Sequence, residues 1–323
     1  LISKYANSQN KVSEADLRAN DPFHVELETL SRTIWTPAAG EALRQTRWFY
    51  ERARGQYRDA LSREGTPARQ RAWKLTHPTS QRFTKTDVSK FENAWAQLPH
   101  EVSRGAQKNF TVFMGELARN PIRPDAAYFQ RLIAKAILWK RTERLVSEQR
   151  FGGYRANLVA YAIAKLSHAT AQRLDLMRIW DAQALDPAVE AAIIELAHLA
   201  WRVLVDGAPP GANITEWAKQ ERCWRNMRDE RWAPPEALQP LMLAVGRSRP
   251  VPEGEESGAE TPAVAACMSV EPSGWFALSN WAKETANLQP WQRKLAYDIG
   301  IRMNRGRPPS IRQAQYGEKI LAE

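Results

Sequence analysis

Cysteine, histidine and long apolar runs are scarce in this sequence of 323 residues. Cys223 and Cys267 are the two cysteines, and they lie outside any CxxC or Cys/His cluster, so neither a disulfide framework nor a structural zinc site is expected. No run approaches the ~18 to 20 apolar residues of a membrane-spanning helix, and no signal segment opens the chain. We therefore expect no membrane segment, no metal, no cofactor, and a reducing, cytoplasmic compartment.

Recognisable catalytic motifs are missing as well. The sequence contains no nucleophile elbow, Walker loop, dinucleotide-binding glycines or HExxH. Glu195 and His198 have the ExxH spacing of carboxylate-bridged di-metal bundles, but such a site needs a second ExxH, which this sequence does not contain. We therefore favour a helix-surface histidine beside a glutamate over a metal site. Because catalytic residues can converge from distant positions, the sequence leaves open whether this chain is an enzyme.

Positive charge and tryptophan, by contrast, are abundant. The formal net charge of +10 and the pI near 9.7 favour acidic partners such as DNA or RNA. Each of the 13 tryptophans carries a large apolar area and one N–H donor, so we expect large packing contacts with polar rims.

Apolar residues recur at helical spacing along most of the chain, and strand-like alternation appears nowhere at convincing length. The sequence therefore predicts an all-α fold, a multi-helix bundle with a small C-terminal three-helix unit. Helix starts are clearest at Asp21-Pro22 and Asp186-Pro187, where an N-cap precedes a proline at the first helical position. The predicted helices at about 125–148, 158–166 and 187–204 are apolar enough to form the central core.

Composition divides the chain into four parts. Residues 1–40 are predicted to continue a domain that precedes Leu1, and residues 41–240 to form the main helical domain. Residues 241–271 are predicted to be a linker, because Gly, Pro, Ser and acidic residues dominate its centre. Residues 272–323 then form the three-helix unit.

The densest positive region starts at ALRQTRWFYERARGQY, residues 42–57. We expect one helix from residue 42 to about 64, with Phe49 and Tyr57 on an apolar stripe and Arg47, Arg54 and Arg58 on a charged one. The following stretch, 66–85, is expected to be an exposed basic loop with a short helix around Trp73.

Two interpretations of the charged stripe stay open. Arg47, Arg54 and Arg58 could contact phosphate together with Lys74 and Arg82 from the following stretch. Alternatively, these arginines could pair with acidic residues nearby or on other helices, although local pairs contribute only ~0.3 to 0.5 kcal/mol each.

A second basic cluster, Arg302, Arg305, Arg307 and Arg312, surrounds Pro308-Pro309 just before a predicted helix. Arginines beside free N–H groups at a helix start could bind an anion, and a solvated loop is the alternative.

Several stretches together resemble the abortive infection phage resistance (AIPR) family, in its C-terminal half. They occur in order along nearly the whole chain, apart from residues 241–271. The matching segments are ISKYANSQNKVSEADL, PFHVELETLSRTIW, RQTRWFYERARGQY, FTKTDVSKFENAW, GAQKNF, YFQRLIAKAI, GYRANLVAYAIAKL, ITEWAKQERCW and LQPWQRKLAYDIG.

The resemblance implies a bacterial or phage-encoded protein of antiviral defence, with a substantial N-terminal half before Leu1. Asn7, Asn10 and Lys11 would follow that half directly and could complete a site shared with it.

Two functional hypotheses follow. The chain could bind nucleic acid or position it for an activity in the N-terminal part. Alternatively, it could be a protein-interaction or homo-oligomerisation scaffold that docks through tryptophan-rich surfaces. The tryptophans in question are Trp217, Trp224, Trp232, Trp275 and Trp281.

Overall fold

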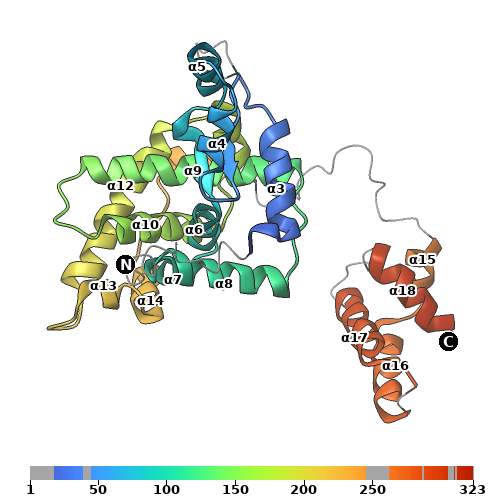
Figure 1. Cartoon of the computed structure of the whole chain (residues 1–323). Helices are drawn as coiled ribbons and strands as arrows, with labels where there is room; N and C mark the ends of the chain where they lie inside the picture. The colour runs from blue at the N-terminus through green and yellow to red at the C-terminus, as the bar shows by residue number, and fades with distance from the viewer. Residues whose placement is uncertain are drawn as a thin grey trace, which may run out of the picture. The chain divides into compact units, whose positions relative to one another are not determined.

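A computed structural model describes residues 18–38, 45–244, 262–285, 287–304, 309 and 311–322. It divides into two compact units, Leu1–Val245 and Gly246–Glu323, and both are built from helices (Figure 1). The all-α prediction is confirmed, with one short pair of strands as the exception.

The helices of the first unit are α3 (Pro22–Thr33), α4 (Gln56–Ser62), α5 (Pro67–Thr76), α6 (Lys85–Trp95), α7 (Pro99–Ser103), α8 (Ala106–Arg119), α9 (Ala126–Glu148), α10 (Arg155–Ala169), α11 (Leu176–Ala182), α12 (Pro187–Trp201), α13 (Ile214–Trp217) and α14 (Glu221–Asp229). Shorter turns are η1 (Arg18–Asn20), η2 (Thr79–Gln81), the π-helix η3 (Arg202–Asp206) and η4 (Glu236–Leu241). The strands are β1 (Phe49–Glu51) and β2 (Arg82–Thr84).

The centre of the first unit is α10, packed against α9 and α12 as expected (Figure 1). Every residue of α10 from Leu158 to Ser167 is buried, so this helix has no solvent face along that stretch. The helix starts at Asp21-Pro22 and Asp186-Pro187 are confirmed, because each aspartate accepts a hydrogen bond from the backbone two residues on.

The predicted helix over residues 42–64 is wrong in its described part, which begins at residue 45. Residues 49–51 form β1, which pairs in parallel with β2 through Phe49 and Arg82, Tyr50 and Phe83, and Glu51 and Thr84. All three residues of β1 are buried, so its sequence carries no alternation of apolar and polar residues. A helix resumes only at Gln56.

Two further predictions are corrected. The stretch 66–85 contains the expected exposed helix around Trp73, α5, but it continues into η2 and β2 and is not otherwise a loop. The predicted linker 241–271 contains a helix, α15 (Pro262–Met268).

The second unit contains α15, α16 (Pro272–Thr285), α17 (Pro290–Asn304) and α18 (Ile311–Ala322), so α15 joins the three helices that were predicted. Its core surrounds Trp275, which is fully buried and donates its indole N–H to the Cys267 carbonyl at 3.1 Å. Val264, Ile299 and Ala314 complete this core.

Candidate nucleic-acid interface

The turn between β1 and α4 is held by three side-chain contacts. Gly55 adopts φ +85°, a left-handed conformation that glycine reaches without strain, and its N–H donates to Oε1 of Glu51 at 2.6 Å. Oε1 of Gln56 accepts hydrogen bonds from the backbone N–H groups of Arg52 and Ala53 at 3.0 and 3.1 Å. The chain therefore leaves the sheet and starts α4 in one tight bend.

Helix α5 contains no buried residue and lies at the edge of the first unit beside α4 (Figure 1). Two hydrogen bonds fix its C-terminal end. The N–H of Arg47 donates to the Thr76 carbonyl at 2.8 Å, and the Tyr57 hydroxyl donates to the His77 carbonyl at 2.7 Å. Its Trp73 ring stacks on His77 at 4.5 Å and meets Tyr57 at 4.8 Å.

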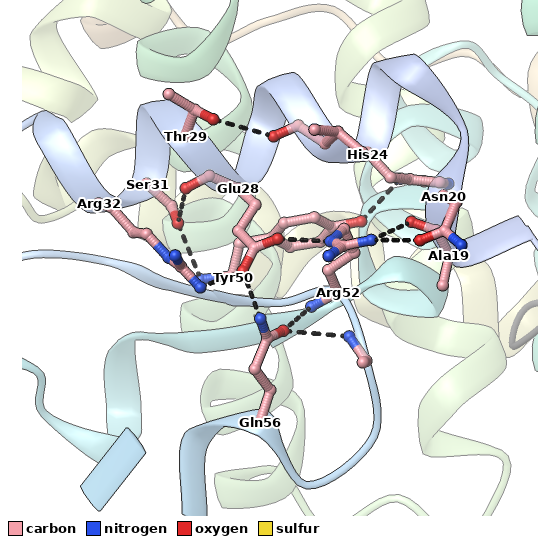
Figure 2. Close-up of polar contacts among 12 residues, drawn as sticks. Ala19, Asn20, His24, Glu28, Thr29, Ser31, Arg32, Tyr50, Arg52 and Gln56 are labelled. Atoms are coloured by element: carbon pink, nitrogen blue, oxygen red, sulfur yellow. Dashed lines mark hydrogen bonds and ion pairs between the residues drawn. The ribbon is translucent and has the colours of Figure 1, made fainter. Parts of the chain in front are cut away.

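Glu28 of α3 is the hub of a polar network that reaches α4 (Figure 2). Its side chain is nearly inaccessible, and its carboxylate accepts hydrogen bonds from Arg32, Arg52 and Gln56. A buried carboxylate needs such donors, because an unpaired charge away from water is costly. One acidic group thus orients two guanidinium groups and one amide.

Arg52 extends this network to the first described turn of the chain. It donates to the Ala19 carbonyl at 2.8 Å and to Oδ1 of Asn20 at 2.9 Å (Figure 2). Nearby, the Tyr50 hydroxyl lies 2.7 Å from Nδ1 of His24, which is fully buried. Burial, with the positive charges of Lys85 and Arg52, lowers the pKa of His24 to about 3.

A pocket of about 460 Å³ opens between α3, β1, α4 and the end of α5. We call it the arginine pocket, because three guanidinium side chains from separate elements line it: Arg32, Arg47 and Arg63. Its remaining lining residues are Ser31, Phe49, Gln56, Asp59, Ala60, Glu64, Trp73 and His77.

Arg47 is the most constrained of the three arginines. Its guanidinium carbon lies 3.9 Å from the centre of the Trp35 ring, which is a cation–π contact. Its Nε is buried and has no hydrogen-bond partner within the described part of the chain. Burial lowers the pKa of His77, and the charge of Arg47 acts in the same direction, so His77 is neutral at pH 7.

Next to the pocket, α4, the residue that follows it and α5 carry five exposed basic residues. We call these residues the α4–α5 basic surface: Arg58, Arg63, Arg69, Arg71 and Lys74. No carboxylate of the described residues lies within 4.0 Å of any of their charged groups. These cations are therefore not used in ion pairs within the described fold.

The structure separates the residues that sequence placed on one charged stripe. Arg58 and Lys74 belong to the α4–α5 basic surface, whereas Arg47 lines the pocket and Arg54 is exposed in the turn before α4. Arg82 lies on β2, 3.5 Å from Glu51 and 5.6 Å from the Tyr57 ring, so an internal partner occupies it.

The other proposed sites are distributed differently. Arg302 is exposed in the last turn of α17, in the second unit, while Arg305 and Arg307 lie outside the described residues. Asn7, Asn10 and Lys11, expected at a shared site, are also outside them.

Tryptophans expected at a docking surface are mostly core residues. Trp217, Trp224 and Trp275 are buried within their own units. Trp232 is half-buried and donates its indole N–H to Glu195 at 3.1 Å, and Trp281 is exposed. Three of these five tryptophans therefore contribute to the cores of their own units.

The ExxH pair does not form a metal site with described neighbours. Glu195 accepts the hydrogen bond from Trp232, and His198 packs on Phe151 at 4.9 Å between ring centres. Within the described ranges, no three His, Cys, Asp or Glu side chains are grouped so that they could hold a metal ion. None of the helices described is long and apolar enough to cross a membrane.

Sequence reasoning missed the contributions of Arg32 and Glu28. Both lie on α3, and no local spacing relates them to α4 or α5. Arg63 lies within the densest positive region of the sequence, but its position in a pocket depends on the tertiary fold. The aromatic content of residues 48–57 and the density of arginine were the usable signals.

The chain is thus an all-α protein whose first unit carries the α4–α5 basic surface and the arginine pocket. The family model described as AIPR protein matches residues 1–208, and the chain belongs to this family. Membership in the family points to a role in phage defence. No curated protein and no solved structure matches the chain.

Proposed function

We propose that this region of a phage-defence protein binds nucleic acid, DNA or RNA, through the α4–α5 basic surface and positions it for an activity in another part of the protein. The observation that carries the proposal is the set of five exposed basic side chains without ion-pair partners among the described residues. Cations of this kind bind the phosphates of nucleic acid favourably, because each phosphate contact releases counterions condensed on the nucleic acid.

The balance of charge along this segment supports the same conclusion. Between residues 52 and 74, seven basic residues face two acids, Asp59 and Glu64. These basic residues are Arg52, Arg54, Arg58, Arg63, Arg69, Arg71 and Lys74. Of them, Arg52 is held by Glu28, and the positions on α4 and α5 are exposed to solvent. The family membership, with its link to phage defence, makes nucleic acid a reasonable partner.

The test is binding of a fluorescent oligonucleotide, followed by anisotropy over a series of salt concentrations. A triple variant, Arg69→Gln with Arg71→Gln and Lys74→Gln, should bind at least about tenfold more weakly, and its salt slope should fall by roughly 0.9 for each lost duplex phosphate contact. A control of equal charge change replaces exposed arginines elsewhere in the first unit: Arg123→Gln, Arg222→Gln and Arg225→Gln.

Binding by the control variant should stay within about twofold of the unmodified chain. The proposal is wrong if the unmodified chain fails to bind single- or double-stranded DNA or RNA at low salt. It is also wrong if both triple variants weaken binding equally, because net charge alone would then explain the affinity.

A further inference from the structure

We propose that the arginine pocket binds a single nucleotide, with its terminal phosphate on Arg32, Arg47 and Arg63. This inference deepens the proposed function and rests on it for one step. That step is the delivery of a strand end along the α4–α5 basic surface. Free nucleotides and phosphorylated strand ends share this chemistry.

The guanidinium groups support an anionic occupant. Arg63 has no carboxylate within 4.0 Å among the described residues, and Arg47 has a buried Nε without a described partner. Arg32 gives one nitrogen to Glu28, and its side chain is 62% exposed, so its remaining donors can still turn toward a ligand. Arginine forks match phosphate oxygens in geometry as well as charge.

The pocket's size favours a nucleotide over a bare phosphate ion. At about 460 Å³ it falls within the usual range for small-molecule sites, roughly 300 to 1,000 Å³. Phe49 and Trp73 supply aromatic surface against which a base can pack. A phosphate ion alone would not fill a pocket of this volume.

The two acids of the pocket are consistent with the same occupant. Asp59 and Glu64 line it, and neither is within 4.0 Å of a cationic group in the part of the chain described. Carboxylates accept hydrogen bonds from the amino groups of bases and from ribose hydroxyls. With three arginines and two acids, the pocket keeps one excess positive charge for a phosphate that carries about −1.5 to −2 at pH 7.

Arg63 belongs to both the pocket and the basic surface. A strand bound at this surface can therefore place its terminal phosphate in the pocket through Arg63. Glu28 acts as a positioning residue here, because it holds Arg32 and Gln56 at the pocket wall.

The experiment measures binding of AMP, GMP, adenosine and inorganic phosphate to the 323-residue chain by calorimetry. We expect AMP or GMP to bind at least about tenfold more tightly than adenosine, since a charged hydrogen bond contributes roughly 1.5 to 3 kcal/mol. Arg63→Gln should weaken nucleotide binding about tenfold. Arg123→Gln, an exposed position outside both the pocket lining and the α4–α5 basic surface, is the matched control and should leave nucleotide binding within about twofold.

A second arm separates free nucleotides from strand ends. Oligonucleotides with a 5′-phosphate, a 3′-phosphate or only hydroxyl ends compete with labelled AMP. Tighter binding of one phosphorylated end, lost in Arg63→Gln, assigns the pocket to strand ends. Displacement by AMP and GMP with no preference among the oligonucleotide ends assigns it to free nucleotides.

The inference is overturned if neither nucleotide binds at about 5 mM and no phosphorylated end is preferred. It is equally overturned if adenosine binds as well as AMP, or if Arg63→Gln and Arg123→Gln behave alike. None of these outcomes would affect oligonucleotide binding that depends on Arg69, Arg71 and Lys74. The proposed function is therefore tested separately from this inference.

Discussion

Arg141 and Glu190 join α9 to α12 through two parallel hydrogen bonds of 2.6 Å, one from Nε and one from a terminal guanidinium nitrogen. This two-point contact fixes the relative rotation of the side chains at the edge of the core. The hydrogen bonds from Arg141 also lower the pKa of Glu190. A single ammonium group cannot reproduce the geometry, because it offers donors from one point.

We predict that Arg141→Lys lowers the free energy of unfolding by about 1 kcal/mol. The matched control is Arg144→Lys on the same helix, whose pair with Glu148 is exposed and should change stability by less than about 0.5 kcal/mol. Urea unfolding followed by circular dichroism measures both. Equal losses of unfolding free energy in the two variants would show that the two parallel hydrogen bonds of Arg141 contribute no more stability than an ordinary surface ion pair.

A second prediction concerns acid stability and His24. Its pKa is lowered from 6.5 to about 3 by burial, so it stays neutral in the fold while the unfolded chain protonates near pH 6.5. Its contribution to stability is therefore complete above pH 6.5 and is lost as the pH falls toward 3, by about 1.4 kcal/mol per pH unit.

His24→Gln removes this titration and keeps a side chain that can hydrogen-bond the Tyr50 hydroxyl. Between pH 7 and pH 5, unfolding free energy should fall by about 2 kcal/mol more in the unmodified chain than in the variant. Gln107→Asn, at an exposed position without an ionisable group, should leave the pH dependence unchanged. The same slope in all three proteins would contradict the assignment to His24.

The third prediction addresses a buried amide network between α6 and α8. Asn109 accepts from Nδ2 of Asn93 at 2.7 Å and donates to the Ser89 hydroxyl at 2.9 Å. Asn109→Leu removes both side-chain hydrogen bonds, so that Asn93 and Ser89 keep only their bonds to the backbone carbonyls of Asn109 and Thr86, and it should cost about 2 kcal/mol in urea unfolding. Gln107→Leu, exposed on the same helix, should change stability by less than about 0.5 kcal/mol, and a similar effect of the two would refute the network's role.

The fourth prediction tests the core of the second unit. A Cβ at Gly317 would lie 2.8 Å from Sγ of Cys267 and 3.2 Å from the Trp275 ring, so Gly317→Ala should open this core. The measurement is alkylation of Cys267 by N-ethylmaleimide, expected to accelerate about fivefold or more. Cys223, buried in the first unit, should not change.

Gly115→Ala is the control, and it should stabilise the protein where Gly317→Ala disrupts the packing. Its nearest neighbour would be a terminal nitrogen of Arg119 at 4.0 Å, and the exposed helical site should gain about 0.5 to 1 kcal/mol. If Gly317→Ala leaves Cys267 as protected as before, the packing at this glycine is looser than the structure shows.

Local signals explain which helices could be predicted. Asp21-Pro22 and Asp186-Pro187 specify helix starts through a side-chain cap and a fixed φ, and both depend only on adjacent residues. The apolar periodicity of α9, α10 and α12 is equally local. These elements were predicted correctly because no distant partner decides their structure.

Residues 49–51 show why the rest could not be predicted. Phe49 and Tyr57 have the spacing of a helical stripe, and they do touch, with ring centres 5.1 Å apart. Strand β1 nevertheless forms because Tyr50 pairs with Phe83, a partner more than thirty positions away in the sequence. The arginine pocket depends on the same non-local pairing, so composition could indicate its arginines but not their convergence.

The parallel pairing of β1 and β2 also gives the segment between them a fixed base. Its two ends are registered side by side, with Tyr50 and Phe83 buried beneath, while α4 and α5 lie between those anchors in sequence. Lengthening such a crossover changes mainly its closure entropy, by about 0.6 kcal/mol for each doubling. Changes in the length and charge of the segment between β1 and β2 can therefore alter what this segment binds. The helical core against which the two strands pack keeps its own sequence requirements.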